Sequence, residues 1–218
     1  MRLISTSRNF KILTALYAFA VLGAALNSFG ASRVSLALLT PLAMALLGIV
    51  SLLLTYELSV RSMGALGGVV ILLFLCQALG ANAGFPFGDF AFTSGLGPKV
   101  LDVPLVMPFA WLSILIPAWV SADKVLRYRN AVVASIIVTA VDAVLEFAAG
   151  SLDLWHWKGE LPTELNYISW FGVSYLVFTI LEKYAREKQL NPIVPHFLYA
   201  QILYFALTDL ALRFLVSH

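Results

Sequence analysis

Seven apolar stretches, separated by short polar segments, run along the chain. They cover residues 11–29, 34–55, 64–81, 103–121, 131–149, 166–181 and 194–216. A helix needs about 20 apolar residues to cross a hydrocarbon layer of about 30 Å. The pattern therefore predicts an all-α fold, a polytopic membrane bundle of about seven transmembrane helices. Residues 1–218 are expected to form a single transmembrane domain, because the connections are too short to hold a soluble one.

Composition and charge support a membrane protein and suggest its orientation. Apolar residues make up 61% of the chain and charged residues 12%, against about 25% charged in a soluble domain. If the N-terminus is cytoplasmic, ten Lys and Arg fall on inner segments and four on outer segments, as the positive-inside rule requires. The first apolar stretch is too long for a typical signal-peptide core and is expected to be a retained helix. We expect an integral protein of a prokaryotic cytoplasmic membrane, in contact with membrane lipid.

Polar side chains interrupt several of the predicted spans. They are Gln77, Asp142, Glu146 and Asp209, with Arg213 one turn after the last. A charged group in hydrocarbon costs roughly 2.5 to 3.5 kcal/mol even on the mild insertion scale, so such residues usually face a bundle interior and carry function. In the predicted orientation they lie toward the outer ends of their helices. This asymmetry suggests a pocket that opens toward the outer leaflet.

The spacing of the acidic residues permits two interpretations. Asp142 and Glu146 are four residues apart and share one helix face. Two carboxyl groups so close in a low dielectric do not both ionise, so one keeps its proton beside a potential base. Asp142, the deeper one, is the expected proton donor, and Glu146 the expected base. Alternatively, both bind Arg213 or tyrosine hydroxyls and hold the bundle together. Asp209 and Arg213 are predicted to form a structural ion pair.

Two outer connections are rich in aromatic residues. Residues 81–102 contain four phenylalanines among several Gly and Pro, and a connection of that length usually carries function or is disordered. The phenylalanines favour a loop that folds back over the mouth of the bundle. In residues 150–162, Trp155 and Trp157 alternate with His156. They could form an aromatic belt at the membrane interface, or a lid and wall for an elongated apolar ligand.

Several chemistries are disfavoured by what the sequence contains. The three histidines, His156, His196 and His218, are too few for a membrane di-iron hydroxylase or desaturase. The sequence has no Gly-rich phosphate loop, HExxH or GxSxG motif. Neither a metal nor a cofactor is therefore expected. Nucleic acid is not an expected partner, because no basic patch is interleaved with aromatic residues.

Two regions together resemble the integral-membrane carotenoid hydratase family, which includes gamma-carotene 1′-hydroxylases and bisanhydrobacterioruberin hydratases. The first region holds the segments Gly84-Phe-Pro-Phe-Gly88, Phe92-Thr93, Leu96-Gly-Pro-Lys99 and Val103-Pro-Leu-Val-Met-Pro-Phe-Ala-Trp111. The second holds Asp142-Ala-Val-Leu-Glu146, Trp155-His-Trp157 and Asn166-Tyr-Ile-Ser-Trp170. Three positions depart from the family pattern. The family has an acid where this chain has Gln77, Asp-Pro where it has Glu146-Phe147, and Gly where it has Ser169.

The resemblance implies a cofactor-independent hydro-lyase that acts on a carotenoid or another long isoprenoid. Such an enzyme adds water to a terminal double bond of an acyclic C40 or C50 polyene, through protonation to a tertiary carbocation. Asp142 and Glu146 would supply the acid and the base, and Asn166 would orient the water. Aromatic side chains would stabilise the cation. The implied substrate-binding residues are Gln77, Phe85, Phe87, Trp155, Trp157 and Trp170.

Two other functions are compatible with the sequence. The first is a non-catalytic carotenoid-binding or assembly subunit of a membrane complex, which the amide at Gln77 favours and which would have a membrane-protein partner. The second is a small-solute transporter, which only the charges within the spans favour. The chain shows no internal repeat, which counts against a transporter.

Overall fold

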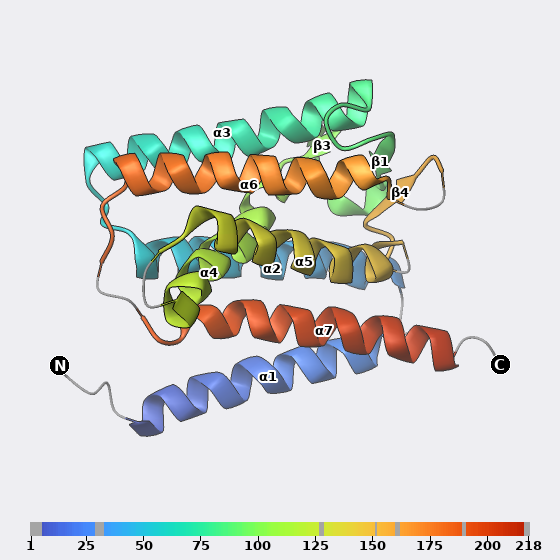
Figure 1. Ribbon diagram of the computed structural model, residues 1–218. Coiled ribbons are helices and arrows are strands. Elements are labelled where there is room, and N and C mark those ends of the chain that lie inside the picture. Colours follow the sequence, from blue (N-terminus) through green and yellow to red (C-terminus); the bar gives the residue numbers. More distant parts are fainter. Residues whose placement is uncertain are drawn as a thin grey trace.

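The computed structural model describes residues 6–28, 33–126, 129–150, 152–159, 162–188 and 191–215. These residues form seven α-helices and four short strands. Consecutive helices run in opposite directions along one bundle (Figure 1). The helices are α1 (Thr6–Ser28), α2 (Arg33–Thr55), α3 (Val60–Ala83), α4 (Met107–Leu126), α5 (Ala131–Ala149), α6 (Glu164–Tyr184) and α7 (Val194–Leu215).

Each of the seven predicted helices has a counterpart, and most of the boundaries agree within four residues. The fourth helix begins at Met107 instead of residue 103, because Val103–Pro104 forms a short strand. Some details of the prediction lie outside the described residues. These are the end points Phe29 and Val216, the basic residues Arg2 and Arg127, His218, and residues 151, 160 and 161 of the second aromatic connection.

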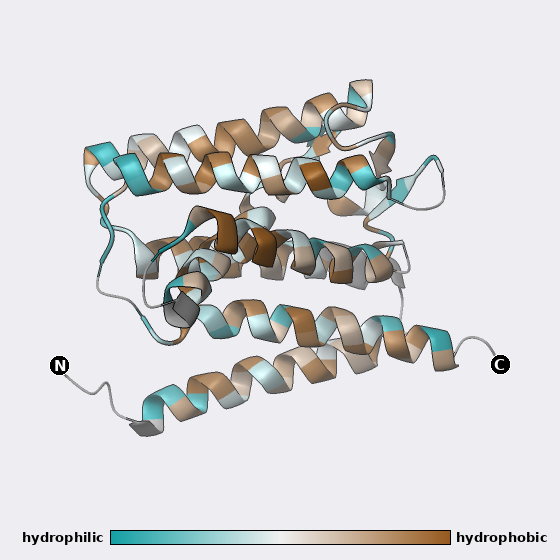
Figure 2. Cartoon of the chain, in the orientation of Figure 1, coloured by the Kyte–Doolittle hydropathy of each residue, from teal (hydrophilic) through white to brown (hydrophobic). Residues whose placement is uncertain are grey.

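Four helices of the described chain are long and apolar enough to cross a membrane. They are Arg8–Leu26 within α1, Val60–Ala83, Ala131–Ala149 and Val194–Phe214 within α7. α2 and α4 have shorter apolar stretches, Leu39–Thr55 and Met107–Asp123. Figure 2 shows brown, hydrophobic residues along the helices and teal residues mainly near their ends and in the connections. The protein therefore has the helices of a membrane protein, while seven spans and their orientation stay predictions.

α4 occupies the centre of the bundle. Residues 110–122 of this helix are all buried, and α4 packs against α2, α3, α5 and α7. A helix that is apolar on all sides is stable only when other helices surround it. Within the core, Trp119 of α4 stacks on Phe178 of α6 with ring centroids 5.1 Å apart.

A polar contact holds the connection after α6 against the core. Glu187 accepts a hydrogen bond of 2.9 Å from the Trp119 indole nitrogen and forms an ion pair with Arg129. Its backbone also pairs with that of Tyr56 after α2. Burial raises the pKa of the Glu187 carboxyl, while the bond from Trp119 and the charge of Arg129 oppose that change. This cluster lies at the end of the bundle where α2 and α6 finish.

Short strands close the opposite end. β1 (Phe90–Phe92) pairs antiparallel with β4 (Trp155–Trp157), and β2 (Lys99–Val100) pairs with β3 (Val103–Pro104). In the first pair, Phe90 lies opposite Trp157 and Phe92 opposite Trp155. The loop of residues 81–102 thus packs on the mouth of the bundle, as predicted. Three of its four phenylalanines, Phe87, Phe90 and Phe92, are buried, whereas Phe85 is 65% exposed.

We predict that Gly48→Ala destabilises the bundle. Gly48 lies where α2 approaches α4 most closely. A Cβ added there would overlap the Phe109 carbonyl oxygen and lie 2.9 Å from the Ser113 backbone nitrogen. Backbone atoms cannot rotate away, and overpacking typically costs about 1 to 3 kcal/mol. Thermal unfolding in detergent should show a lower midpoint for Gly48→Ala.

The matched control is Gly67→Ala on α3, where an added Cβ meets nothing within 4 Å. Alanine also has the higher helix propensity. This variant should unfold at the temperature of the unmodified protein or slightly above. Equal midpoints for the two variants would contradict the close α2–α4 packing.

Candidate functional site

The two carboxyl groups of α5 meet the first turn of α6. Asp142 and Glu146 lie one turn apart on the same face of α5, and Asn166 is the third residue of α6. The Asn166 side-chain nitrogen donates to Asp142 Oδ2 at 2.8 Å and to Glu146 Oε1 at 3.5 Å. One amide therefore bridges both acids, and the alternation of the helices brings all three residues to the same end of the bundle.

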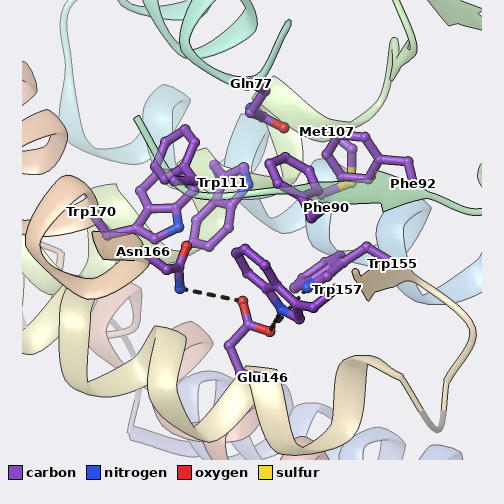
Figure 3. Close-up of a pocket in the computed structure, with 11 residues that line it drawn as sticks. Gln77, Phe90, Phe92, Met107, Trp111, Glu146, Trp155, Trp157, Asn166 and Trp170 are labelled. Carbon is purple, nitrogen blue, oxygen red and sulfur yellow. Dashed lines mark hydrogen bonds between the residues drawn. The ribbon is translucent and has the colours of Figure 1, made fainter. Parts of the chain in front are cut away.

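Two indoles bind the carboxyl group of Glu146. Glu146 Oε2 accepts hydrogen bonds from Trp157 Nε1 at 2.8 Å and from Trp155 Nε1 at 3.1 Å (Figure 3). Alternate residues of a strand point to the same side, so the Trp-His-Trp order of β4 directs both indoles to Glu146. His156 points the other way and bonds to Asp153 at 3.0 Å.

A small aromatic cavity lies above Glu146. It has about 20 Å³ of free space, enough for a single water molecule. The rings around it are in contact, with centroid separations of 3.6 Å for Trp111–Trp170 and 4.8 Å for Phe87–Trp170. The cavity is lined by Gln77, Phe87, Phe90, Phe92, Met107, Trp111, Glu146, Trp155, Trp157, Asn166 and Trp170.

Of the nine residues proposed for catalysis or substrate binding, seven line this cavity and two do not. Asp142 is fully buried one turn below Glu146, outside the lining. Phe85 is largely exposed and also lies outside it. Asp209 and Arg213 form an i, i+4 ion pair on α7, with Nε and Oδ2 2.9 Å apart. The hydrogen bonds of the two α5 acids go to Asn166 and the tryptophans, whereas Arg213 pairs with Asp209.

Sequence reasoning missed four lining residues, Phe90, Phe92, Met107 and Trp111. A signal for two of them was present. Phe-Ala-Phe at residues 90–92 and Trp-His-Trp at residues 155–157 both alternate large and small or polar side chains, the period of a half-buried strand. Two such short strands would be expected to pair, which would have directed Phe90 and Phe92 to the face that holds the tryptophans.

Gln77 contributes an unpaired acceptor to the cavity wall. Its side-chain nitrogen donates to the Leu73 carbonyl oxygen one turn earlier at 3.1 Å. Its side-chain oxygen is buried and has no hydrogen-bond partner among the described residues. Figure 3 shows this oxygen turned toward the ring of aromatic residues. A water molecule in the cavity could donate a hydrogen bond to it.

α6 tethers the loop that closes the cavity. Ser169 donates a 2.5 Å hydrogen bond to the Pro86 carbonyl oxygen, and Thr163 donates one of 3.3 Å to that of Phe87. On the α3 side the loop packs against Gly80. A Cβ there would come within 2.7 Å of the Phe90 ring and 2.9 Å of the Phe87 ring.

The arrangement joins a carboxyl pair, space for one water molecule and a wall of aromatic rings. Within the described part of the chain, no three His, Cys, Asp or Glu residues are grouped as metal ligands would be. A carboxyl pair beside aromatic rings is suited to proton transfer to and from an apolar molecule.

Comparison with known proteins gives a match to a family model. A family model described as "carotenoid biosynthesis protein" matches residues 32–217, which is most of the chain. Neither a curated protein nor a solved structure matches it.

We predict that Ser169→Ala loosens the loop over the cavity. The change removes the bond to Pro86, and a hydrogen bond of this kind typically contributes about 0.5 to 1.5 kcal/mol. Amide hydrogen exchange across residues 85–92 should become faster. Ser174→Ala is the control, because the Ser174 hydroxyl bonds within α6, to Trp170 and Phe171. Equal exchange in the two variants would mean that Ser169 does not hold the loop.

Proposed function

Because the chain belongs to the carotenoid biosynthesis protein family, we propose that it is a carotenoid hydratase. It adds water to a terminal double bond of an acyclic C40 or C50 polyene, without a cofactor. The observation that carries the proposal is the placement of a bridged carboxyl pair beneath a water-sized cavity with aromatic walls. An alkene has no polar group to which the protein could hydrogen-bond, so its activation by protonation needs a proton donor inside an apolar enclosure.

The hydrogen bonds favour a different protonation state for each acid. Glu146 receives N–H bonds from two indoles and from Asn166. Indoles can only donate, so Glu146 must accept. Asp142 receives one bond, and its Oδ1 has no partner among the described residues. A negative charge is better stabilised where more donors surround it. The pair therefore holds one proton, carried by Asp142, and one charge, carried by Glu146.

The reaction then follows in two steps. The Asp142 proton adds to the less substituted carbon of the double bond, whose electron pair forms the new C–H bond and leaves a tertiary cation on the terminal, dimethyl-substituted carbon. Trp111, Trp170 and the Glu146 charge stabilise this cation. Water adds through an oxygen lone pair, Glu146 takes the released proton, and transfer of that proton to Asp142 restores the starting state. No oxidant or reductant is consumed.

Asn166 controls access between Asp142 and the cavity. Its side chain lines the cavity and is also bonded to Asp142. Asp142 lies below the lining, so its proton reaches a substrate when the Asn166 side chain turns aside. The first turn of α6 also places the positive end of a helix dipole beside the pair, which favours a single negative charge there.

A carotenoid-binding or assembly subunit is the second candidate, and Gln77 favours it. An amide in the cavity wall cannot release a proton, while the aromatic wall would still hold a polyene end. This candidate predicts a bound but unmodified pigment, so the same assay separates the two functions.

The proposed topology places the cavity toward the outer side of the membrane. The predicted seven spans put the N-terminus in the cytoplasm and the strand-capped end of the bundle outside. Reporter fusions after Lys188 and after His218 should give opposite locations, inside and outside. The same location for both would show that α7 does not span.

We predict that Asp142→Asn abolishes hydration but keeps pigment binding. The amide is close in shape to the acid yet donates no useful proton, and general acid catalysis is typically worth about 10² to 10⁴ in rate. Glu146→Gln should also impair the reaction. The assay is expression in a host that accumulates an acyclic carotenoid, with mass analysis for the gain of one water molecule.

Asp209→Asn is the control, since the same substitution on α7 affects only the ion pair with Arg213 and leaves the cavity intact. It should keep full activity. Equal hydration by Asp142→Asn and the unmodified protein would refute the assignment of the donor. An inactive unmodified protein that retains pigment would favour the binding subunit.

A further inference from the structure

Three cavities follow one another from the carboxyl site to the opposite side of α2. The aromatic cavity shares Met107, Trp111 and Trp155 with a second cavity of about 10 Å³ between α2, α4 and α5. The second cavity shares Met44 with a groove of about 350 Å³ between α1, α2 and α7. The second cavity therefore shares lining residues with both the groove and the carboxyl site.

The groove is long and almost entirely apolar. Its α1 wall extends from Leu16 to Leu26, roughly 15 Å at 1.5 Å per residue. Its polar members are bonded to protein groups. Thr40 Oγ1 and the Tyr204 hydroxyl are 2.7 Å apart, and Gln201 bonds to Ser113 at 2.7 and 3.0 Å. Among the residues that the structure describes, none of those that line the groove is charged.

We propose that this groove holds the hydrocarbon chain of the polyene while one end of the molecule reaches the carboxyl site. The inference rests on the proposed hydratase function and extends it to the binding site of the rest of the substrate. Room for a single water molecule at the carboxyl site cannot accommodate a C40 chain. The chain needs an apolar channel that leads to the site, and the groove with its connecting cavity provides one.

The lining favours a hydrocarbon over a membrane phospholipid. A phospholipid needs partners for its charged headgroup, and the described residues of the groove lining include no charged side chain. A polyene without polar groups needs only apolar contact along its length. The line of cavities leads the end of a polyene to the carboxyl pair, whereas an acyl chain has no need to extend there.

Met44 and Met107 form the gate between the groove and the site. Both are nearly buried, and they line the connecting cavity with Trp111. Methionine is unbranched and changes shape easily, so rotation of these two side chains can join the cavities without movement of a helix. Small residues keep the groove wide, among them Ala20, Gly23, Ala43 and Ala200.

Two neighbouring leucines of α2 give a matched test. Leu47 lines the groove and is half-buried, whereas Leu46 is 63% exposed and lies outside the lining. Leu47→Trp should fill the groove and Leu46→Trp should not. Both proteins are purified from a host that accumulates an acyclic C40 carotenoid, and bound pigment is measured by absorbance per protein. We expect about tenfold less pigment with Leu47→Trp, the equivalent of about 1.4 kcal/mol, and no loss with Leu46→Trp.

A second measurement separates this inference from the hydratase proposal. A short acyclic isoprenoid hydrocarbon with the same terminal group reaches the carboxyl site without extending into the groove. Leu47→Trp should hydrate it as fast as the unmodified protein, while its turnover of the C40 polyene falls about tenfold. If the unmodified protein hydrates neither compound, the hydratase proposal fails and pigment binding still decides the role of the groove.

Three results would overturn the groove as the polyene site. The first is equal pigment binding by Leu47→Trp and Leu46→Trp. The second is loss of bound phospholipid, detected by mass analysis, with no loss of pigment from Leu47→Trp. The third result is needed only if Leu47→Trp does not fold. In that case Ala43→Leu fills the same groove with an aliphatic side chain, and unchanged pigment binding by this variant would reject the proposal.

Discussion

The bond between Glu146 and the two indoles of β4 organises the functional end of the bundle. An ionised carboxyl group inside an apolar bundle is unfavourable unless several donors surround it. Trp155 and Trp157 provide two donors from one strand, and this fixes the orientation of β4 on α5. β4 in turn pairs with β1, which carries Phe90 and Phe92 to the cavity. The hydrogen bonds that one carboxyl group accepts thus hold most of the aromatic wall in place.

Sequence reasoning succeeded where long apolar periodicity governs the structure, and missed contacts that depend on tertiary pairing. The seven helices follow from runs of apolar residues, and the closeness of Asp142 and Glu146 follows from helical spacing. Apolar periodicity could not distinguish the exposed from the buried phenylalanines of the 81–102 loop. Phe90 and Phe92 face inward because β1 pairs with β4, more than 60 positions later, whereas Phe85 lies outside β1 and is exposed.

The central position of α4 links the carboxyl site to the groove. Met107 and Trp111 belong to the first turns of this helix, line the aromatic cavity and also line the connecting cavity. Because α4 is buried on all sides, these side chains have little freedom to rotate except where Met107 lines the connecting cavity. One wall of the groove comes from α1, whose residues 6–28 precede the matched segment 32–217. The size of the groove is therefore set partly by a helix outside that segment.

Gln77 limits which residues can carry the proton transfers of the proposed reaction. The family resemblance places an acid at this position, but the amide has no proton to give, and its nitrogen is held by the Leu73 carbonyl oxygen. Its oxygen remains a hydrogen-bond acceptor directed at a cavity that fits one water molecule. A water molecule that donates to Gln77 and to Glu146 would turn an oxygen lone pair toward the carbocation. In the proposed reaction, Gln77 then positions the attacking water and the Asp142–Glu146 pair carries every proton transfer.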